Sequence, residues 1–213
     1  MYLPDHFRED KTDAMHALMR AAPFAVLVTA GASGPEATHM PTVLANEPPL
    51  GAIEAHMARA NPHWKTSPGD ADALVIFSGP DHYIRPGWYP SKADGGKAVP
   101  TWNYAAVHAY GRLEVIKDQD WLRQHVGELS AQQERGTAQP WSIEEAPEDY
   151  LRMMLRGIIG VRMVITRLEG KWKMSQNRND ADRAGVLAGL EREGTDKARA
   201  VARLVRARID RSV

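Results

Sequence analysis

The sequence contains no cysteine among its 213 residues. Structural disulfides, thiolate metal sites and a cysteine nucleophile are therefore excluded, which suits a reducing compartment such as the cytoplasm. The amino-terminal residues carry charges where a signal peptide would have its apolar core. The best apolar run, Ile158 to Ile165, is too short to span a bilayer. We therefore expect a cytoplasmic protein that is neither exported nor membrane-bound.

Several motifs of common enzymes are also missing. No Gly-x-Gly-x-x-Gly segment follows a predicted strand and no Walker-type loop occurs, which disfavours a Rossmann fold. The eight histidines show no His-x-x-x-His spacing, so we expect no metal site. No serine lies in a Gly-x-Ser-x-Gly segment, and a serine nucleophile therefore has almost no support.

The charge balance gives no sign of a strongly charged partner. Twenty-seven basic residues match 27 acidic ones, so the whole molecule offers no strong field to nucleic acid or anionic lipid. Residues 197–211 are an exception, because six Lys or Arg residues there accompany a single Asp. Such a helix is usually a solvated face, and its alternative role is salt-sensitive contact with DNA phosphates.

The pattern of apolar residues predicts an antiparallel sheet or small barrel of five to seven strands with helices inserted between them. Strands are expected over residues 24–29, 37–44, 73–77, 99–116, 158–168 and 172–176, with another short strand approaching His56. Helices are expected over residues 12–20, 58–61, 118–129 and 148–155, and as two carboxy-terminal helices separated near Gly194.

Two predicted strands carry polar groups that suit a ligand. Thr101 and Asn103 share one strand face, so both could point toward a ligand while Trp102 and Tyr104 pack behind or beside it. A shift of one residue in register reverses this assignment, and a plain core strand is the alternative. The last predicted strand places Lys171, Lys173 and Ser175 on one face and Gln176 on the other. Tryptophans beside ammonium, hydroxyl and amide groups indicate a flat, phosphorylated cofactor.

A third segment, residues 56–64, offers a possible phosphate anchor. Arg59 lies close to His56 and Asn61, and a guanidinium presents two parallel donors to two anionic oxygens. Arg59 could equally form a surface ion pair. His39 has a similar ambiguity, because its ring could lie with the Thr42 hydroxyl beside a cofactor or simply at a sheet surface.

These segments together resemble the PaiB-type family of FMN-binding negative transcriptional regulators, within the flavin-binding split-barrel superfamily. The resemblance runs along most of the chain and becomes less distinct after Arg178. It is carried by residues 1–7, 23–24, 27–29, 37–41, 56–64, 77–84, 88–90, 99–104, 107–111 and 169–177, among them the segments His56-Met-Ala-Arg-Ala-Asn-Pro-His-Trp64 and Gly170-Lys-Trp-Lys-Met-Ser-Gln-Asn177.

The resemblance implies a mainly β fold with flanking helices. It implies a six-stranded FMN-binding split barrel over residues 1–178 and a helical extension over residues 179–213. It also implies a homodimer, with FMN near the subunit interface. Carried over residue by residue, it places Arg59 and Lys173 at the phosphate; Asn61, Thr101, Asn103 and Ser175 as donors around phosphate, ribityl chain or ring; and His39, His56, Tyr104 and Gln176 as further candidates.

Two functions of different classes follow. The first is a homodimeric FMN-binding protein that negatively regulates transcription, with flavin as ligand or redox sensor and DNA contacted through the basic carboxy-terminal helix. The second is an FMN-dependent oxidoreductase that uses NAD(P)H to reduce a small substrate. Fold analogy does not choose between them, and whether the chain is an enzyme stays open. An empty barrel acting as an interaction module, or a pocket for haem or another flat ligand, are further alternatives.

Overall fold

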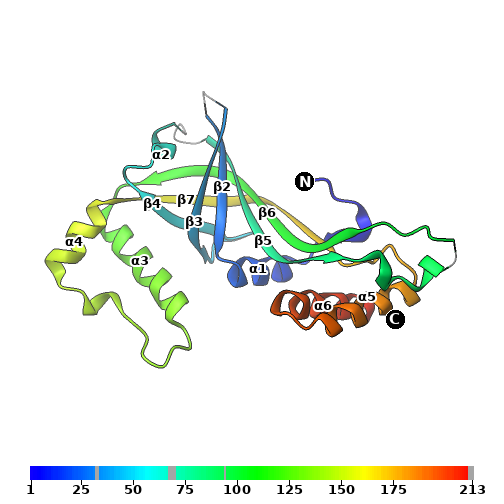
Figure 1. The fold of residues 1–213 in the computed structure, drawn as a ribbon. Coiled ribbons are helices and arrows are strands. Elements are labelled where there is room, and N and C mark those ends of the chain that lie inside the picture. The colour runs from blue at the N-terminus through cyan, green and yellow to red at the C-terminus, as the bar shows by residue number, and fades with distance from the viewer. Residues whose placement is uncertain (32–33, 67–70, 94, 211–213) are drawn as a thin grey trace. The chain divides into compact units, whose positions relative to one another are not determined.

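The computed structural model describes residues 1–31, 34–66, 71–93 and 95–210. In this part of the chain, seven strands form one antiparallel sheet and helices are inserted between them (Figure 1). The strands are β1 (Arg8–Glu9), β2 (Phe24–Gly31), β3 (Gly34–Ala45), β4 (Ala52–Ala58), β5 (Ala71–Ile84), β6 (Thr101–Ile116) and β7 (Ile158–Lys173). The α-helices are α1 (Thr12–Ala21), α2 (His63–Thr66), α3 (Gln119–Glu134), α4 (Glu148–Arg156), α5 (Asp180–Glu193) and α6 (Asp196–Ile209).

The chain packs as two compact units. The first, which we call the barrel unit, consists of Thr12–Phe77 and His108–Leu168. The second, the terminal unit, consists of Met1–Lys11, Ser78–Val107 and Glu169–Val213. Strands β5, β6 and β7 contribute residues to both. The expected boundary near residue 178 stays a prediction, and α5 begins shortly after it at Asp180.

The barrel unit takes its name from a closed ring of strands. The sheet order is β1-β7-β4-β3-β2-β5-β6, and β6 also pairs with β7, so the strands from β2 to β7 close on themselves. Closure places the backbones of β6 and β7 very close together at Gly111, where any Cβ would overlap the Val164 carbonyl oxygen and the Met163 side chain. Glycine is therefore required at this position.

Alternation along the strands fills the interior of the barrel unit. In β2, Ala25 and Leu27 are fully buried while their neighbours are half-buried or exposed, as expected for one strand face toward a core. The other strands do the same, and burying each large aliphatic side chain contributes about 1.5 to 3 kcal/mol. The buried side chains include Met40, Ile53, Met57, Val75, Phe77, Ile159, Val161, Met163 and Ile165.

Helices α3 and α4 form a second, smaller core in the barrel unit. The Asp118 side chain caps α3 by accepting a hydrogen bond from the Trp121 backbone N–H at 2.8 Å. The core beneath the two helices contains Leu122, Ile143, Leu151 and Leu155. Trp121 packs against it, over Gly160 of β7, where a Cβ would overlap the indole. No helix in the described ranges has the length and apolar character of a membrane span.

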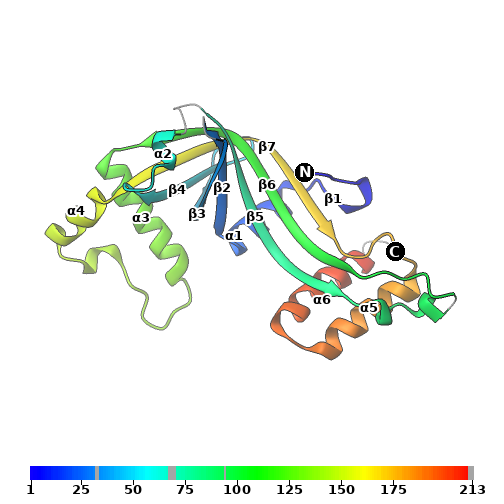
Figure 2. The same cartoon turned by 45° about the horizontal axis from the view of Figure 1, so that its top comes forward.

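In the terminal unit, α5 and α6 lie side by side (Figures 1 and 2). Gly194 ends α5 in the left-handed conformation with φ of 64°, which separates the two helices. Gly185 and Gly189 allow α5 to pack directly on Trp88, since a Cβ at either position would overlap that residue. Asp182 fastens α5 further by accepting hydrogen bonds from the Ser91 backbone N–H at 3.0 Å and hydroxyl at 2.7 Å.

Most predicted elements are confirmed, but four expectations were wrong. The strand expected over residues 172–176 ends at Lys173 as part of β7, and residues 174–177 bend and turn. Residues 58–61 end β4 and turn, and the helix starts only after Pro62, whose fixed φ suits a helix start rather than an interior. Strand β5 does not stop before Pro80 but continues to Ile84. The proline is tolerated because β2 pairs only with Ala73–Ile76, so Pro80 lies beyond that hydrogen-bonded ladder. The expected turn at Glu169–Gly170 is strand, since β1 pairs with this part of β7 and supplies a ladder partner.

Candidate functional site

The predicted site residues fall into two sets, one in each unit. The barrel unit holds His39, His56, Arg59 and Asn61. The terminal unit holds Thr101, Asn103, Tyr104, Lys173, Ser175 and Gln176.

His63 organises the loop that carries Arg59 and Asn61. Its imidazole is fully buried between two threonine hydroxyls, with Nε2 at 2.8 Å from Thr29 Oγ1 and Nδ1 at 2.7 Å from Thr38 Oγ1. Asn61 completes the network by donating from Nδ2 to Thr38 Oγ1 at 3.1 Å and accepting the His63 backbone N–H at 3.0 Å. Burial lowers the pKa of His63, although Glu36 opposes the shift. At pH 7 the ring is therefore neutral, and its two hydrogen bonds hold the loop after β4 in place.

Arg59 is held rigidly by backbone carbonyls. Its Nε donates to the Arg156 carbonyl at 2.6 Å and its Nη2 to the Ile158 carbonyl at 3.1 Å. The Arg59 carbonyl in turn accepts a hydrogen bond from Trp64 Nε1 at 3.0 Å. No described residue forms an ion pair with Arg59, and Nη1 has no hydrogen-bond partner among them. The result is an immobilised cation that still has unused hydrogen-bond donors, two residues before Asn61 in the chain.

The two predicted histidines of the barrel unit have different surroundings. His39 is exposed on β3 and stacks against Phe24, with ring centroids 6.1 Å apart. His56 on β4 instead faces α3, where its Nδ1 lies 3.2 Å from Nε2 of the buried His125. Burial lowers the pKa of His56. Burial first and His56 second lower the pKa of His125 to about 4, so both rings are neutral at pH 7.

In the terminal unit, Lys173 reaches from the end of β7 to the start of β6. Its Nζ donates to Thr101 Oγ1 and to the Trp102 carbonyl, both at 2.6 Å. Because the Thr101 oxygen accepts from the lysine, its own hydroxyl hydrogen remains available to a ligand. Lys171 lies one strand repeat away, where Nζ donates to the Tyr2 carbonyl at 2.9 Å and lies 5.4 Å from the Tyr104 ring centroid.

The charge of this lysine set is not neutralised within the described residues. Lys171, Lys173 and Arg178 form no ion pair with any carboxylate that the structure describes. Burial lowers the pKa of Lys173, and the positive charges of Lys171 and Arg178 lower it further. A bound anion would relieve this repulsion, so the set is suited to an anionic ligand.

Asn103 and Ser175 hydrogen-bond each other in the interior. Asn103 is fully buried on β6 and donates from Nδ2 to Ser175 Oγ at 3.0 Å, whereas its neighbour Trp102, which was expected to pack behind the ligand face, is exposed. Ser175 follows β7 with φ of 65°, a conformation that non-glycine residues adopt only when the surroundings hold them there. Gln176 closes the same turn, with Oε1 accepting from the Met174 backbone N–H at 2.6 Å and Nε2 donating to the Trp172 carbonyl at 2.5 Å. These contacts fix the turn after Lys173.

Two exposed aromatic rings lie beside the lysine set. Trp102 on β6 is 53% exposed and Tyr83 on β5 is 40% exposed, and their rings meet edge to face with centroids 5.9 Å apart. The Trp102 carbonyl is also an acceptor for Lys173. Large exposed rings are costly in contact with water, so this pair is suited to covering a flat ligand.

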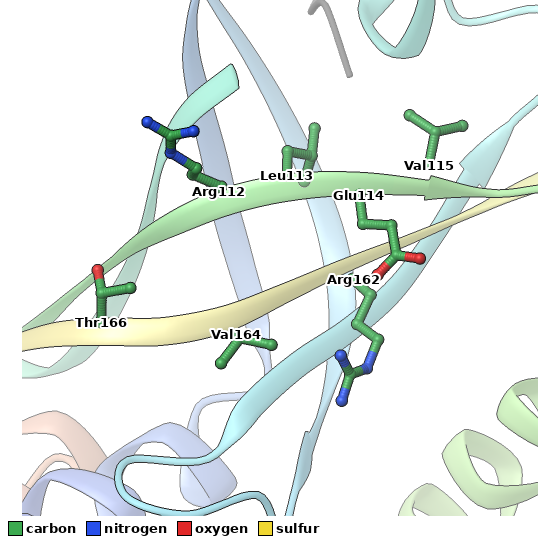
Figure 3. A pocket seen from close by; sticks show the side chains of 7 residues that line it. All are labelled: Arg112, Leu113, Glu114, Val115, Arg162, Val164 and Thr166. Atoms are coloured by element: carbon green, nitrogen blue, oxygen red, sulfur yellow. The ribbon is translucent and has the colours of Figure 1, made fainter. Parts of the chain in front are cut away.

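A cleft of about 540 Å³ in the barrel unit lies outside the predicted residues. It is open to solvent along β6 and β7, where Arg112 and Leu113 project from one strand and Val164 and Thr166 from the other (Figure 3). Arg162 at one end is engaged by Glu54 at 3.2 Å and by Glu47. The cleft therefore offers less unpaired positive charge than either predicted set.

Sequence reasoning missed the roles of His63, His125 and Arg178. The rings of His63 and His125 contact residues 25 to 69 positions away in the sequence, so no local pattern identifies them. Arg178 directly follows the last segment that carries the resemblance, and a cation five residues after Lys173 was a signal that could have been used.

The family of the chain follows from comparison with known proteins. Residues 1–167 match the family model described as "Putative FMN-binding domain". The chain belongs to this FMN-binding family. An uncharacterised relative in Emericella nidulans is 34% identical over 98% of this chain and 97% of its own length. The protease synthase and sporulation protein PAI 2 of Bacillus subtilis is 29% identical over the full length of both chains, which confirms the PaiB-type resemblance.

Solved structures confirm the fold of this FMN-binding family member. The FAD and heme binding protein from Mycobacterium smegmatis has a TM-score of 0.60 at 16% identity, covering 85% of this chain and 80% of its own. The flavocytochrome Anf3 from Azotobacter vinelandii has a TM-score of 0.58 at 15% identity, covering 84% and 75%. At these identities the likeness shows the fold alone. The mainly β split barrel with flanking helices was correctly predicted.

The residues of both sets fit FMN, which is the cofactor of the family. FMN joins a phosphate dianion to a polyol and a flat ring, and when bound it supplies one- and two-electron redox chemistry. Arg59 with Asn61 provides a cation and an amide for a phosphate. Lys173 with Thr101 provides a cation and a hydroxyl beside exposed rings. Neither set contains an acid that would repel the phosphate among its described contacts.

Proposed function

We propose that this chain is a homodimeric FMN-binding protein of the cytoplasm with a regulatory role, in which flavin is a ligand or redox sensor for negative control of transcription. The observation that carries cofactor binding is the immobilised guanidinium of Arg59, whose Nε and Nη2 donate to two carbonyls. The regulatory role rests on the PaiB-type resemblance.

Arg59 suits a phosphate because its orientation is set before the ligand arrives. A free arginine side chain loses rotamer freedom when it binds, whereas the carbonyls of Arg156 and Ile158 already hold this one. The Asn61 amide is fixed in the same way through Thr38 and His63. A charge-assisted pair from such a group contributes on the order of 1.5 to 3 kcal/mol.

The test is the dissociation constant of FMN, measured by quenching of flavin fluorescence. Arg59→Ala should raise it about ten- to a hundredfold. Arg112→Ala, which removes an arginine of the cleft along β6 and β7, serves as the matched control and should leave it unchanged. An unchanged constant in Arg59→Ala together with a large loss in Lys173→Ala would move the phosphate to the lysine set.

Contact with DNA through α6 has less support than the sequence suggested. Arg199 pairs with Asp196 at 2.7 Å, while Arg206 pairs with Glu191 and Arg208 with the buried Glu9. Phosphates of DNA would have to compete with these partners. Arg203 is exposed and no described residue pairs with it. Arg203→Glu should therefore weaken low-salt retention on DNA if α6 is the contact, and unchanged retention would exclude this helix.

The second candidate is an FMN-dependent oxidoreductase, and the lysine set beside the exposed rings is the observation that favours it. Positive charge at Lys171 and Lys173 beside the Trp102 and Tyr83 rings suits stabilisation of a reduced, anionic flavin. A reductase should bleach its flavin on addition of NADH or NADPH and recover its colour with an acceptor. No bleaching with either nucleotide would count against this candidate and favour the regulatory one.

A further inference from the structure

Three consecutive carbonyls hold Arg59, and two of them belong to the end of α4. The Arg59 backbone N–H donates to the Gly157 carbonyl at 2.8 Å. The side chain donates from Nε to the Arg156 carbonyl at 2.6 Å and from Nη2 to the Ile158 carbonyl at 3.1 Å. Ile158 is fixed by the sheet, since it begins β7 and pairs with Ala58 of β4. Arg156 and Gly157 precede that ladder at the end of α4, so the orientation of the guanidinium depends on the position of α4.

Helix α4 packs against α3 through a shared core (Figure 1). Leu151 and Leu155 of α4 are buried in this core together with Leu122 of α3, and Ile158 packs against it. Separating the two helices would expose these side chains, at a cost of about 1.5 to 3 kcal/mol each. A shift of α3 would therefore carry α4, and the carbonyls at its end, along with it.

Helix α3 is in turn fixed to the sheet at two points. Trp121 lies over Gly160 of β7, where a Cβ would overlap the indole. One helical turn later, Nε2 of the buried His125 lies 3.2 Å from Nδ1 of His56 on β4, the strand that leads to Arg59. The His125 ring also stacks on the indole, with centroids 5.1 Å apart and an angle of 11° between the planes. Trp121 therefore takes part in one contact directly and supports the other.

We propose that Trp121 is a positioning residue for the phosphate anchor, which it orients through α4 and the carbonyls of residues 156 and 157. The inference rests on the proposed binding of the FMN phosphate by Arg59. The indole acts without touching the ligand, because it sets the place of the hairpin formed by α3 and α4. The coupling is reciprocal by thermodynamic linkage, so a phosphate that holds the guanidinium also holds the end of α4.

The first experiment measures the FMN dissociation constant of hairpin variants by quenching of flavin fluorescence. Trp121→Ala should raise it about three- to tenfold, because the carbonyls that orient Arg59 lose their fixed place. Trp121→Phe keeps a ring over Gly160 and should recover most of the affinity. Met19→Ala, at a 1% exposed position of α1, is the control for a general loss of stability and should stay within about twofold of the wild type. An equal rise in Trp121→Ala and Met19→Ala would overturn the positioning role.

The second experiment repeats the change in a protein that lacks the guanidinium. In the Arg59→Ala background, Trp121→Ala should change the dissociation constant by less than about twofold, because the group through which the indole acts is gone. A loss of the same size in both backgrounds would overturn the proposal. An unchanged constant in Arg59→Ala alone would contradict the proposed function, whereas a rise there with none in Trp121→Ala would contradict only this inference.

The third experiment, hydrogen exchange of the unaltered protein, does not depend on the folding of any variant. Saturating FMN should slow the exchange of backbone amides at the end of α4 and leave those of α1 unchanged. The same slowing should be absent in Arg59→Ala at an equal FMN concentration. Exchange at the end of α4 that does not respond to FMN, or that slows no more than exchange in α1, would overturn the coupling.

Discussion

The two units deal with buried polar groups in opposite ways. In the barrel unit, the polar groups of the loop after β4 are satisfied from within, as His63 shows by bonding Thr29 and Thr38 with its two ring nitrogens. In the terminal unit, Lys171, Lys173 and Arg178 accumulate positive charge without a described carboxylate, and the pKa of Lys173 is lowered as a result. The first arrangement builds a rigid scaffold, whereas the second leaves positive charge that lowers stability and suits an anionic ligand.

The largest expected effect concerns the scaffold. His63→Leu removes two buried hydrogen bonds and leaves the Thr38 hydroxyl without its ring acceptor or donor, so the free energy of unfolding should fall by about 3 kcal/mol. Chemical denaturation measures this change. Lys65→Ala, at an exposed position two residues away, is the control and should change it by less than about 0.5 kcal/mol. Equal stability of both variants would refute the scaffold role of His63.

The scaffold also shows where prediction from the sequence succeeds. Strand β2 and helix α3 were predicted because apolar periodicity and the Asp118 cap are local signals. The pairing of Gly170 with Glu9 was not predicted. The dipeptide Glu169–Gly170 has the composition of a turn, and it is strand only because β1, from the start of the chain, pairs with it. Arg59 was predicted as a candidate from its neighbours in sequence. Its immobilisation was not predicted, because the carbonyls that accept its hydrogen bonds lie 97 and 99 residues away.

Two glycines give a matched pair across the units. Gly189 of α5 packs against the Trp88 ring, so Gly189→Ala should destabilise the protein by about 1 to 3 kcal/mol despite the better helix propensity of alanine. Gly127 of α3 has its nearest neighbour, Ile143 Cγ2, at 3.5 Å from an added Cβ. Gly127→Ala should therefore stabilise by about 0.5 to 1 kcal/mol. Thermal unfolding of both variants checks the opposite signs, and a shared sign would show that the packing account is wrong.

The histidine pair between β4 and α3 predicts a pH dependence in the barrel unit. His125 has a pKa of about 4 when folded and 6.5 as its ordinary value, so the unfolded chain binds the proton more tightly. The neutral His125 ring therefore contributes fully to the free energy of unfolding above pH 6.5, and this contribution is lost as pH falls toward 4. Between pH 8 and pH 5 the loss is about 2 kcal/mol. In denaturation experiments between pH 8 and pH 5, His125→Leu should lose less unfolding free energy than the wild type. A pH profile identical to that of the wild type would contradict this assignment.

The smallest effect on stability belongs to the lysine set. Because the charged form of Lys173 is disfavoured in the folded protein, Lys173→Met should change the free energy of unfolding by less than about 1 kcal/mol in low salt. Inorganic phosphate should raise the melting temperature of the wild type more than that of the variant. A large loss of stability in Lys173→Met would place this lysine among the scaffold residues and remove the contrast between the units.

The most direct test of the account is an FMN titration of the wild type and Arg59→Ala, each followed by gel filtration and an absorbance spectrum. The account predicts that the wild type retains the visible bands of the flavin and that Arg59→Ala loses them at the same FMN concentration. Retention of flavin by both proteins with equal dissociation constants would contradict the claim that the guanidinium fixed by the Arg156 and Ile158 carbonyls anchors the phosphate.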